Sequence, residues 1–510
     1  MNRRSVSLAE YFHEETKYSE SSIASLPPVD FSLQPEPFKD YHSERPIDLV
    51  PSLPFQGFPL SPQGGPTPIA ADTLGEMVAR LSRILYFTNG PTGIVNEPGG
   101  IHIFRSAPSA GALYPTEIYL VTRGIPGVED GLYNYSVRFH RLVSVFDGAL
   151  MEEIDEACWG HPALTATSAA VILTGVFGRS SWRYHDRAYR RILLDTGHVL
   201  GNLCLSAEVE GHRAVPIATF ADEPLHRLLF FDATQEGVLV VAPLLSAEEV
   251  ERSGGESVPL RRSLRSQRPV EGEKNLLLAC HLGSFAALDA PVVREDPRPG
   301  DPWSEGETIV LEGTLSSLGS QFWNTVLRRR STRSLAGGDI DREDLARILD
   351  FGNQPSLPGS VRYLNTQGLL ETYLLITQVD GLPAGIYRYH QDEHELEVIR
   401  YGTFREQTHH FCLGQELAAR ASAVVIHTAD LARGVEIFGD RAYRYLHLDA
   451  GFIGQYLNLA AVHLGVGVSG IGGFFDDEIN SLLGIPREHA VVYVTVLGNP
   501  ARSDPFGSTS

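Results

Sequence analysis

The strongest constraint on this chain is a twenty-residue segment that occurs twice. DRAYRRILLDTGHVLGNLCL at 186–205 matches DRAYRYLHLDAGFIGQYLNL at 440–459, with ten of the twenty positions identical. The two segments are 254 residues apart, and the same offset pairs GLYNY at 131–135 with GIYRY at 385–389. Since the offset is half of the 510-residue chain, it indicates one duplicated domain and not a solenoid of short repeats.

Both copies predict the same order of secondary structure. A short helix (72–87 and 341–351) precedes a strand (118–122 and 373–377), and the hairpin and further strands follow. The repeated segment predicts a long helix that is apolar on most sides, and such a helix is buried at an interface. Helices and strands mixed in this order predict an α+β fold class.

Composition divides the chain into four parts. Residues 1–60 are rich in Pro, Ser and acidic groups and predict an extended N-terminal arm, while 61–247 form domain 1. Residues 248–305 have a similar bias and predict a linker, which leaves 306–510 as domain 2. Below, 61–247 is copy one and 306–510 is copy two.

The charge and the cysteines restrict partners and compartment. A formal net charge of −21 opposes binding to nucleic acid and to anionic membranes. No apolar run is long enough to span a bilayer, and the N-terminus lacks the apolar stretch of a signal peptide. The four cysteines lie far apart without a CxxC pair, so we expect no disulfide framework, no metal site and a cytoplasmic location.

Three segments carry candidate binding chemistry. RRRSTRSLAGG at 328–338 offers Arg329, Ser331 and Arg333 to a phosphate, although a solvated basic turn is the simpler interpretation. The glycines of GVSGIGGFF at 467–475 allow backbone N–H groups to approach a flat ligand. In copy one, the small residues Pro108, Ser109, Ala110 and Gly111 precede a strand, where they form either a plain turn or a platform for an aromatic ring.

Together these segments resemble the FMN-dependent nitroreductase superfamily, and within it the SagB-type dehydrogenases. The resemblance rests on FHEETKYS at 12–19, APSAGALYPTEIYLV at 107–121, the paired Gly-x-Tyr-x-Tyr motifs, the repeated helix and RRSTR at 329–333. It implies FMN as cofactor and a fold in which two domains clasp to form flavin sites at their interface. In this chain that arrangement would be an intramolecular pseudo-dimer of two tandem nitroreductase-like domains.

The two copies have lost complementary parts of this pattern. Copy two keeps the arginine cluster and GIGGF, whereas copy one has no Lys or Arg from 46 to 79 and has PIATF at 216–220. Copy one keeps APSAGALYP, whereas copy two has RYLNTQGLLE. We therefore predict one composite FMN site per chain and an empty second site, because a buried phosphate without arginine partners is costly. Random drift is the alternative.

The resemblance implies a role for each site residue. Arg333 would lie near the pyrimidine edge of the flavin, Arg329 and Ser331 on the phosphate and ribityl chain, and the backbone at Ile471, Gly472 and Gly473 near N5. Pro108, Ser109, Ala110 and Gly111 would cover the opposing face, and Arg502 would be a further phosphate partner or a solvated tail residue. Tyr114 is the candidate for proton transfer, or else packs at a strand entrance. Leu113 stands where related azoline oxidases carry a lysine.

These expectations define three candidate functions. The first is a SagB-type, FMN-dependent oxidoreductase that dehydrogenates a peptide or small heterocyclic substrate. The alternatives are an NAD(P)H-dependent nitro or quinone reductase and a catalytically retired flavin-binding scaffold. Because one chain would hold both halves of the site, we expect a monomer. We expect His140, His409 and His410 at the surface, and His198 as a satisfied interface histidine.

Overall fold

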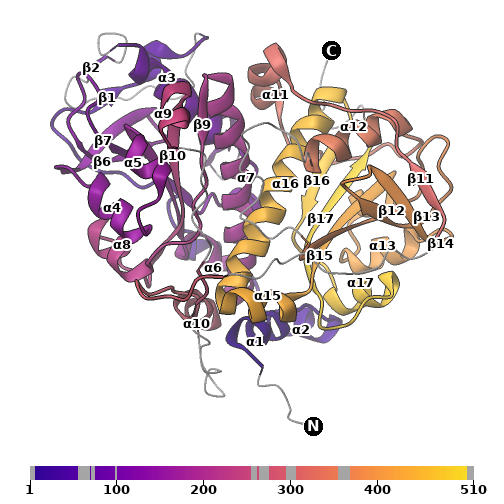
Figure 1. The fold of residues 1–510 in the computed structure, drawn as a ribbon. Helices are drawn as coiled ribbons and strands as arrows, with labels where there is room; N and C mark the ends of the chain where they lie inside the picture. Colours follow the sequence, from indigo (N-terminus) through magenta and orange to yellow (C-terminus); the bar gives the residue numbers. More distant parts are fainter. Residues whose placement is uncertain are drawn as a thin grey trace.

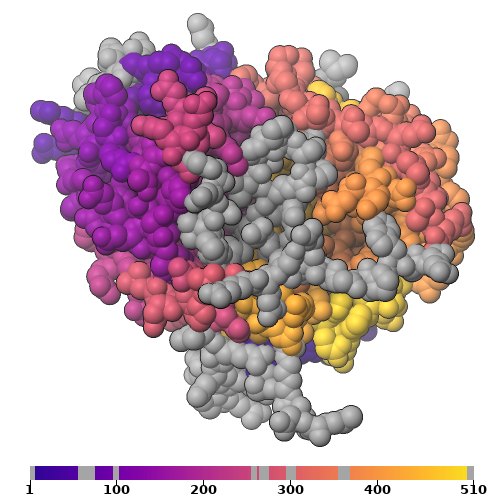
Figure 2. Space-filling model, viewed as in Figure 1, coloured from indigo at the N-terminus to yellow at the C-terminus, as the bar shows by residue number. Residues whose placement is uncertain are grey.

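The computed structural model describes residues 6–55, 69–70, 75–97, 100–253, 261–263, 275–293, 306–353 and 368–501. Copy one lies on the left of Figure 1 in purple and copy two on the right in orange and yellow, with two long helices between them. Figure 2 shows the same two halves side by side as space-filling surfaces.

Copy one is built on an eight-stranded sheet with the order β2-β1-β7-β6-β5-β8-β10-β9. Its strands are β1 (Ile47–Asp48), β2 (Ile69–Ala70), β5 (Thr116–Thr122), β6 (Gly131–Ser136), β7 (Arg141–Asp147), β8 (Ala169–Val176), β9 (His212–Ala214) and β10 (Glu236–Ser246). A separate hairpin is formed by β3 (Pro91–Glu97) and β4 (Gly100–Arg105). β5, β8 and most of β10 are buried along their length, as their apolar sequences require.

Copy two repeats this arrangement in a seven-stranded sheet, β11-β14-β13-β12-β15-β17-β16. Its strands are β11 (Thr308–Val310), β12 (Leu370–Ile376), β13 (Gly385–His390), β14 (Glu395–Tyr401), β15 (Ala423–Ala429), β16 (Gly467–Ile471) and β17 (Ala490–Gly498). The order β7-β6-β5-β8-β10-β9 corresponds strand by strand to β14-β13-β12-β15-β17-β16. The predicted duplication of an α+β domain is confirmed.

The predicted helices are present with shifted ends. The two short ones are α3 (Glu76–Asn89) and α12 (Arg342–Asn353), and the two long ones are α7 (Ala188–Val209) and α16 (Ala442–Leu464). The remaining α-helices are α1 (Leu8–Glu15), α2 (Glu20–Ala24), α4 (Met151–Ala157), α5 (Pro162–Ala166), α6 (Gly178–Tyr184), α8 (Asp222–Leu228), α9 (Ala247–Arg252), α10 (Leu276–Gly283), α11 (Phe322–Arg328), α13 (Arg405–Phe411), α14 (Glu416–Ala419), α15 (Leu431–Phe438) and α17 (Asp476–Leu483).

The two long helices pack against each other at the centre of the molecule (Figure 1). A Cβ atom added to Gly197 would lie 2.3 Å from the carbonyl oxygen of Leu448, and one added to Gly451 would lie 2.2 Å from that of Leu194. These two contacts are related by the repeat, since each partner is 254 residues from its counterpart. Only glycine permits this backbone approach, so the repeated Gly of the motif fixes the crossing of an intramolecular pseudo-dimer.

Reciprocal ion pairs join the two copies beside this crossing. Arg187 and Arg190 of copy one pair with Asp476 of α17 in copy two, at 3.0 and 2.6 Å. In the equivalent arrangement on the other side, Arg441 and Arg444 of copy two pair with Asp222 of α8 in copy one. All six side chains are buried. The first and fourth residues of the repeated RAYRR and RAYRY segments therefore have a structural role, because they join each copy to the other.

A third element completes each of these clusters. In α1 and the turn after it, the carbonyl of His13 and the hydroxyl of Thr16 accept hydrogen bonds from Arg190 at 2.6 and 2.8 Å. The carbonyl of His281 in α10 and the hydroxyl of Ser284 accept the equivalent bonds from Arg444. Segment 248–305 thus does more than connect the domains, because its helix α10 binds Arg444 as α1 binds Arg190.

One minor prediction was wrong. His140 is fully buried, with its ring nitrogens hydrogen-bonded to Ser82 and Tyr135 at 2.9 Å, whereas His410 is exposed as expected and His409 is half-buried. The polar residues around His140 in the sequence gave no sign that a β-turn would fold its ring inward. Of the helices in the described ranges, none combines the length and the apolar character that a membrane span requires.

Candidate functional site

A cavity of about 260 Å³ lies where the two copies meet. Copy one contributes Pro108, Ser109, Ala110, Gly111, Tyr184, Arg191, Leu194, Asp195 and His198, and copy two contributes Ser331, Arg333, Gln415, Ser469, Gly470, Ile471, Gly472, Gly473 and Tyr493. The structure therefore brings together all of the predicted cofactor residues except Arg329 and Arg502. Arg502 lies outside the described residues.

The small-residue loop of copy one is held in place by Asp195 of α7. Ser109 Oγ donates to Asp195 Oδ2 at 2.6 Å, and the Ala110 N–H donates to the same carboxylate at 3.1 Å. The Tyr114 N–H in turn donates to Ser109 Oγ at 2.8 Å. Gly111 follows with a φ of 64°, and a Cβ there would lie 2.6 Å from the Tyr184 hydroxyl. The loop is thus a fixed wall of the cavity and needs glycine at this position.

Asp195 is the carboxylate of this wall. Its burial raises the pKa to about 7, although the hydrogen bonds from Ser109 and Ala110 and the nearby Arg191 act in the opposite direction. The group therefore exchanges its proton near neutral pH.

The glycine loop of copy two forms the opposite wall. A Cβ on Gly470 would lie 1.9 Å from the Tyr493 hydroxyl, so that hydroxyl lies against bare backbone. The same hydroxyl hydrogen-bonds His198 Nε2 at 3.2 Å, and His198 Nδ1 bonds the Leu194 carbonyl at 2.8 Å. Burial lowers the pKa of His198 to about 4, so this satisfied interface histidine is neutral at physiological pH.

The arginine cluster of copy two divides into two parts. Ser331 and Arg333 line the cavity. The buried guanidinium of Arg329 instead donates to the carbonyls of Ser106 and Arg105 at 2.7 and 2.9 Å. Arg329 therefore ties the start of copy two to the chain just before Pro108, and the structure does not place it in the cavity wall.

Tyr114 is likewise close to the cavity without lining it. Its side chain is buried, and its hydroxyl accepts a hydrogen bond from the Arg105 N–H at 3.3 Å. Burial raises the pKa of this phenol above its ordinary value, so proton loss is disfavoured. The structure does not bring this predicted proton-transfer residue into the cavity wall.

Seven lining residues were not predicted from the sequence: Tyr184, Arg191, Leu194, Asp195, Gln415, Ser469 and Tyr493. Arg191 and Asp195 are four residues apart on α7 and therefore share one helix face. Their signal was available, because both lie in the repeated segment and are charged residues on a helix that is expected to be buried.

At the related position on the other side of α7 and α16, the chain itself fills the space. The counterparts of Gly473, Arg191 and Tyr184 are Thr219, Tyr445 and Phe438. The Arg261 N–H donates to Thr219 Oγ1 at 3.1 Å, and the Ser263 N–H donates to the Phe438 carbonyl at 3.0 Å. The Tyr445 hydroxyl donates to the Arg261 carbonyl at 3.5 Å. Residues 261–263 thus occupy the side of copy one that corresponds to the glycine wall.

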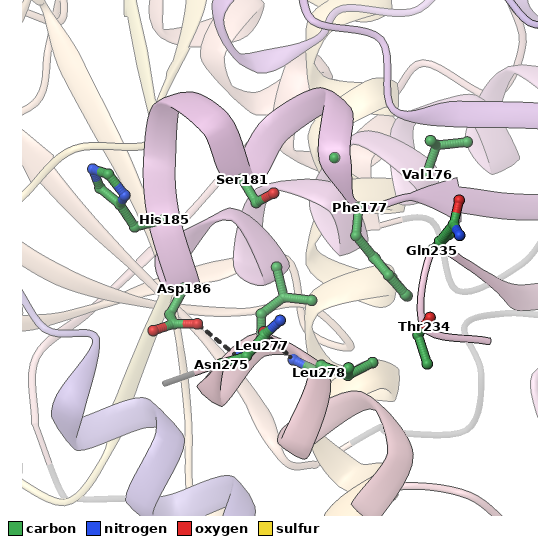
Figure 3. Close-up of a pocket in the computed structure, with 11 residues that line it drawn as sticks. Val176, Phe177, Ser181, His185, Asp186, Thr234, Gln235, Asn275, Leu277 and Leu278 are labelled. Carbon is green, nitrogen blue, oxygen red and sulfur yellow. Dashed lines mark hydrogen bonds between the residues drawn. The ribbon is translucent and has the colours of Figure 1, made fainter. Parts of the chain in front are cut away.

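A larger hollow of about 550 Å³ lies between α6, the turn at 234–235 and α10 (Figure 3). The Leu277 N–H donates to Asp186 at 2.9 Å across its floor. None of the predicted site residues lies here, and its described lining includes neither lysine nor arginine. Nine of the predicted site residues instead line the smaller cavity between the copies.

Comparison with known proteins agrees with this arrangement. The model of the Nitroreductase family matches residues 65–243 and 326–499, which together exceed half of the chain. A crystal structure of a "putative nitroreductase" from Anabaena variabilis ATCC 29413 has a TM-score of 0.87 and 40% sequence identity, and the match covers 98% of this chain and 100% of that one.

Two curated relatives match over shorter stretches. A "putative nitroreductase" of Methanocaldococcus jannaschii is 32% identical over 149 residues, which cover 29% of this chain and 72% of the relative. A trifolitoxin-processing protein of Rhizobium leguminosarum bv. trifolii is 34% identical over 137 residues, which cover 26% of this chain and 37% of the relative. From the two family matches and the full-length structural similarity, this chain belongs to the nitroreductase family.

Proposed function

We propose that the protein is an FMN-dependent oxidoreductase with one composite flavin site per chain. The observation that carries the proposal is the convergence of Pro108–Gly111 from copy one with Ser331, Arg333 and 471–473 from copy two on one cavity. In the superfamily that the sequence resembles, these are the segments that contact the flavin. An FMN bound here would supply hydride exchange.

The donor set and the shape of the cavity suit a flat ring with a phosphate. Ser331 and Arg333 offer a hydroxyl and a guanidinium, which is a common combination for phosphate. The backbone at Gly472 and Gly473 is half-buried, and glycine leaves room there because a Cβ would lie 3.2 Å from Arg191 or 2.9 Å from Leu413. Pro108–Ala110 provides the opposing face, and Arg329 positions that loop through the Ser106 and Arg105 carbonyls.

The remaining polar groups, Asp195 and Tyr114, could position the copy-one loop and hold a proton for the reaction. Asp195 holds the loop and is the titratable carboxylate of the described lining, so it can keep a proton at the cavity wall near neutral pH. Tyr114 would have to release the Arg105 N–H before its hydroxyl could serve in proton transfer. We therefore assign Tyr114 a positioning role and propose Asp195 as the group that holds the proton.

The proposed reaction is dehydrogenation of a peptide or small heterocyclic substrate, as in the SagB type. The similarity to a trifolitoxin-processing protein supports a peptide substrate. Hydride uptake from NAD(P)H is the competing activity within the family. Rapid bleaching of the bound flavin by NADPH in a stopped-flow experiment would favour that activity, and bleaching by a substrate peptide alone would favour dehydrogenation.

FMN binding tests the proposal directly. FMN fluorescence, which falls when the flavin binds, is titrated with wild-type protein, Arg333→Ala and the matched control Arg328→Ala, an exposed arginine of the same cluster outside the cavity. Loss of one charge-assisted contact should raise the Kd of Arg333→Ala by about tenfold or more, with little change for Arg328→Ala. Wild-type protein that retains no FMN, or equal effects of the two substitutions, would overturn the proposal.

A further inference from the structure

One cation of the cavity is not used by the flavin site proposed above. Arg191 lines the cavity but is only 6% exposed, and its Cζ lies 3.7 Å from the centre of the Tyr184 ring. Its Nη2 donates to the Gly472 carbonyl at 3.2 Å. Its Nη1 is buried and has no hydrogen-bond partner among the described residues. A buried guanidinium donor without a partner is unfavourable, which indicates that a ligand completes the set.

The charge of Arg191 acts on Asp195 without a direct ion pair between the two. Within the described ranges, no carboxylate forms an ion pair with it, and Asp195 one turn further along α7 directs its oxygens to Ser109 and Ala110. A second cation contacts the same Tyr184 ring, since Arg183 Cζ lies 5.4 Å from its centre, and Arg183 Nη1 would be 3.1 Å from a Cβ placed on Gly111. Two guanidinium groups therefore contact Tyr184 at the copy-one wall of a protein with a net charge of −21.

Both cations are specific to the open cavity. At the related positions in copy two, Arg191 is replaced by Tyr445 and Arg183 by Ile437. Tyr445 lies where residues 261–263 fill the space and donates to the Arg261 carbonyl. The arginines thus occur only on the side where a ligand can enter, whereas the arginines of the interdomain ion pairs occur in both copies.

We propose that Arg191, with Arg183 beside it, binds an oxyanion on the molecule that exchanges hydride in this cavity. This inference rests on the proposed function, because Ser331 and Arg333 are assigned to the cofactor. The planar fork of arginine matches a carboxylate or a phosphate. The first would be carried by a peptide or heterocyclic acid and the second by a nicotinamide dinucleotide.

The test uses FMN-loaded full-length protein and three probes: benzoate, pyrophosphate and uncharged benzamide. Binding is followed by the change in flavin absorbance, in wild-type protein and in Arg191→Gln and Arg191→Lys. Arg191→Gln should raise the Kd of the preferred anion by about tenfold or more, with the Kd of benzamide and the flavin content unchanged. Arg191→Lys should recover part of the affinity, because it keeps the charge and loses the fork. Preference for benzoate identifies a carboxylate, and preference for pyrophosphate identifies a phosphate.

Three results would overturn the inference alone: neither anion binds wild-type protein, Arg191→Gln binds both anions as wild type does, or the substitution lowers FMN affinity and not anion affinity. If Arg191→Gln does not fold, Arg183→Gln at the same wall gives the same comparison. Flavin content is measured first. Wild-type protein that takes up no FMN rejects the proposed function and this inference with it, whereas FMN uptake without anion selectivity rejects only the inference.

Discussion

Asp195 shows how one residue joins the fold to the site. Its carboxylate is 7% exposed and accepts hydrogen bonds from Ser109 and Ala110. It thereby fixes the copy-one loop against the cavity, and its burial raises its pKa to about 7. In the unfolded chain the pKa of an aspartate is about 3.9.

The pKa of Asp195 predicts a pH dependence of stability. Because the folded state binds this proton more tightly than the unfolded state, the free energy of unfolding should fall as pH rises from about 4 to about 7. The fall attributable to this group should be roughly 2–4 kcal/mol. Urea unfolding of wild-type protein and Asp195→Asn at several pH values measures it, and the two curves should differ most above pH 7. A wild-type minus Asp195→Asn difference that is constant with pH would contradict the assignment.

Residue types in the site were predictable, but the directions of their side chains were not. Pro108–Gly111, Ser331, Arg333 and 471–473 were expected together because the resemblance to the nitroreductase superfamily implies that such segments meet at one flavin site. Arg329 belongs to the same motif, yet its guanidinium binds carbonyls of copy one. Nothing in RRSTR distinguishes these two outcomes, because the carbonyls that bind Arg329 come from a segment more than two hundred residues away.

At the scale of elements, the crossing of α7 and α16 is set by backbone contact at two glycines. Gly197→Ala and Gly451→Ala would each force a Cβ to within 2.3 Å or less of a carbonyl oxygen. Although alanine favours a helix by about 1 kcal/mol over glycine, the overlap should produce a net loss of about 1–3 kcal/mol. Thermal or urea unfolding measures the loss. Gly178→Ala in α6 is the control, because its Cβ would meet nothing within 4 Å. Equal stability of all three variants would contradict the crossing.

The reciprocal ion pairs make a second prediction for the elements. Burial alone would raise the pKa of Asp476, but Arg187 and Arg190 outweigh it and lower the pKa. The carboxylate therefore stabilises the fold above about pH 4, and this contribution is lost as pH falls through the lower folded pKa. At pH 7, Asp476→Ala should cost about 3–5 kcal/mol, because it leaves two buried guanidinium groups without a carboxylate.

The adjacent Asp477 supplies the control for this prediction. Its exposed carboxylate pairs with Lys17 and Arg487, each at 2.8 Å, and Lys17 also pairs with Glu14 at 2.7 Å, so Asp477→Ala should cost less than about 1 kcal/mol. Chemical denaturation at pH 7 compares the two variants, and a smaller loss for Asp476→Ala than for Asp477→Ala would refute the structural role of the ion pairs.

Most elements could be placed from the sequence, and α10 shows why one could not. The long helices and the central strands carry strong apolar patterns and a repeat, so their positions were expected within a few residues. LLLACHLG of α10 is embedded between Pro-rich and acidic stretches that predict a linker. α10 resembles α1 only in two residues that accept hydrogen bonds from an arginine: His281 and Ser284 at α10 correspond to His13 and Thr16 at α1. A pattern of two residues is too short to recognise in the sequence before the arginines that they bind are known.

At the scale of the whole molecule, duplication has produced two unequal copies. The repeat preserves the sheet order, the helix crossing and the ion pairs, which are properties that hold the two domains together. The site residues, in contrast, differ between the copies. The glycine wall, Arg191 and Arg333 line the cavity, whereas residues 261–263 fill the position that the repeat relates to this cavity. We infer that a single chain contains both halves of one site, and we expect it to function as a monomer.

The most direct test of this account is the number of flavins per chain. Protein saturated with excess FMN and freed of unbound flavin is analysed by flavin absorbance against protein concentration, with the mass of the particle measured by light scattering. The account predicts one FMN per 510-residue chain in a monomer. Two FMN per chain would show that the position filled by residues 261–263 is a working site, and would contradict the composite-site account.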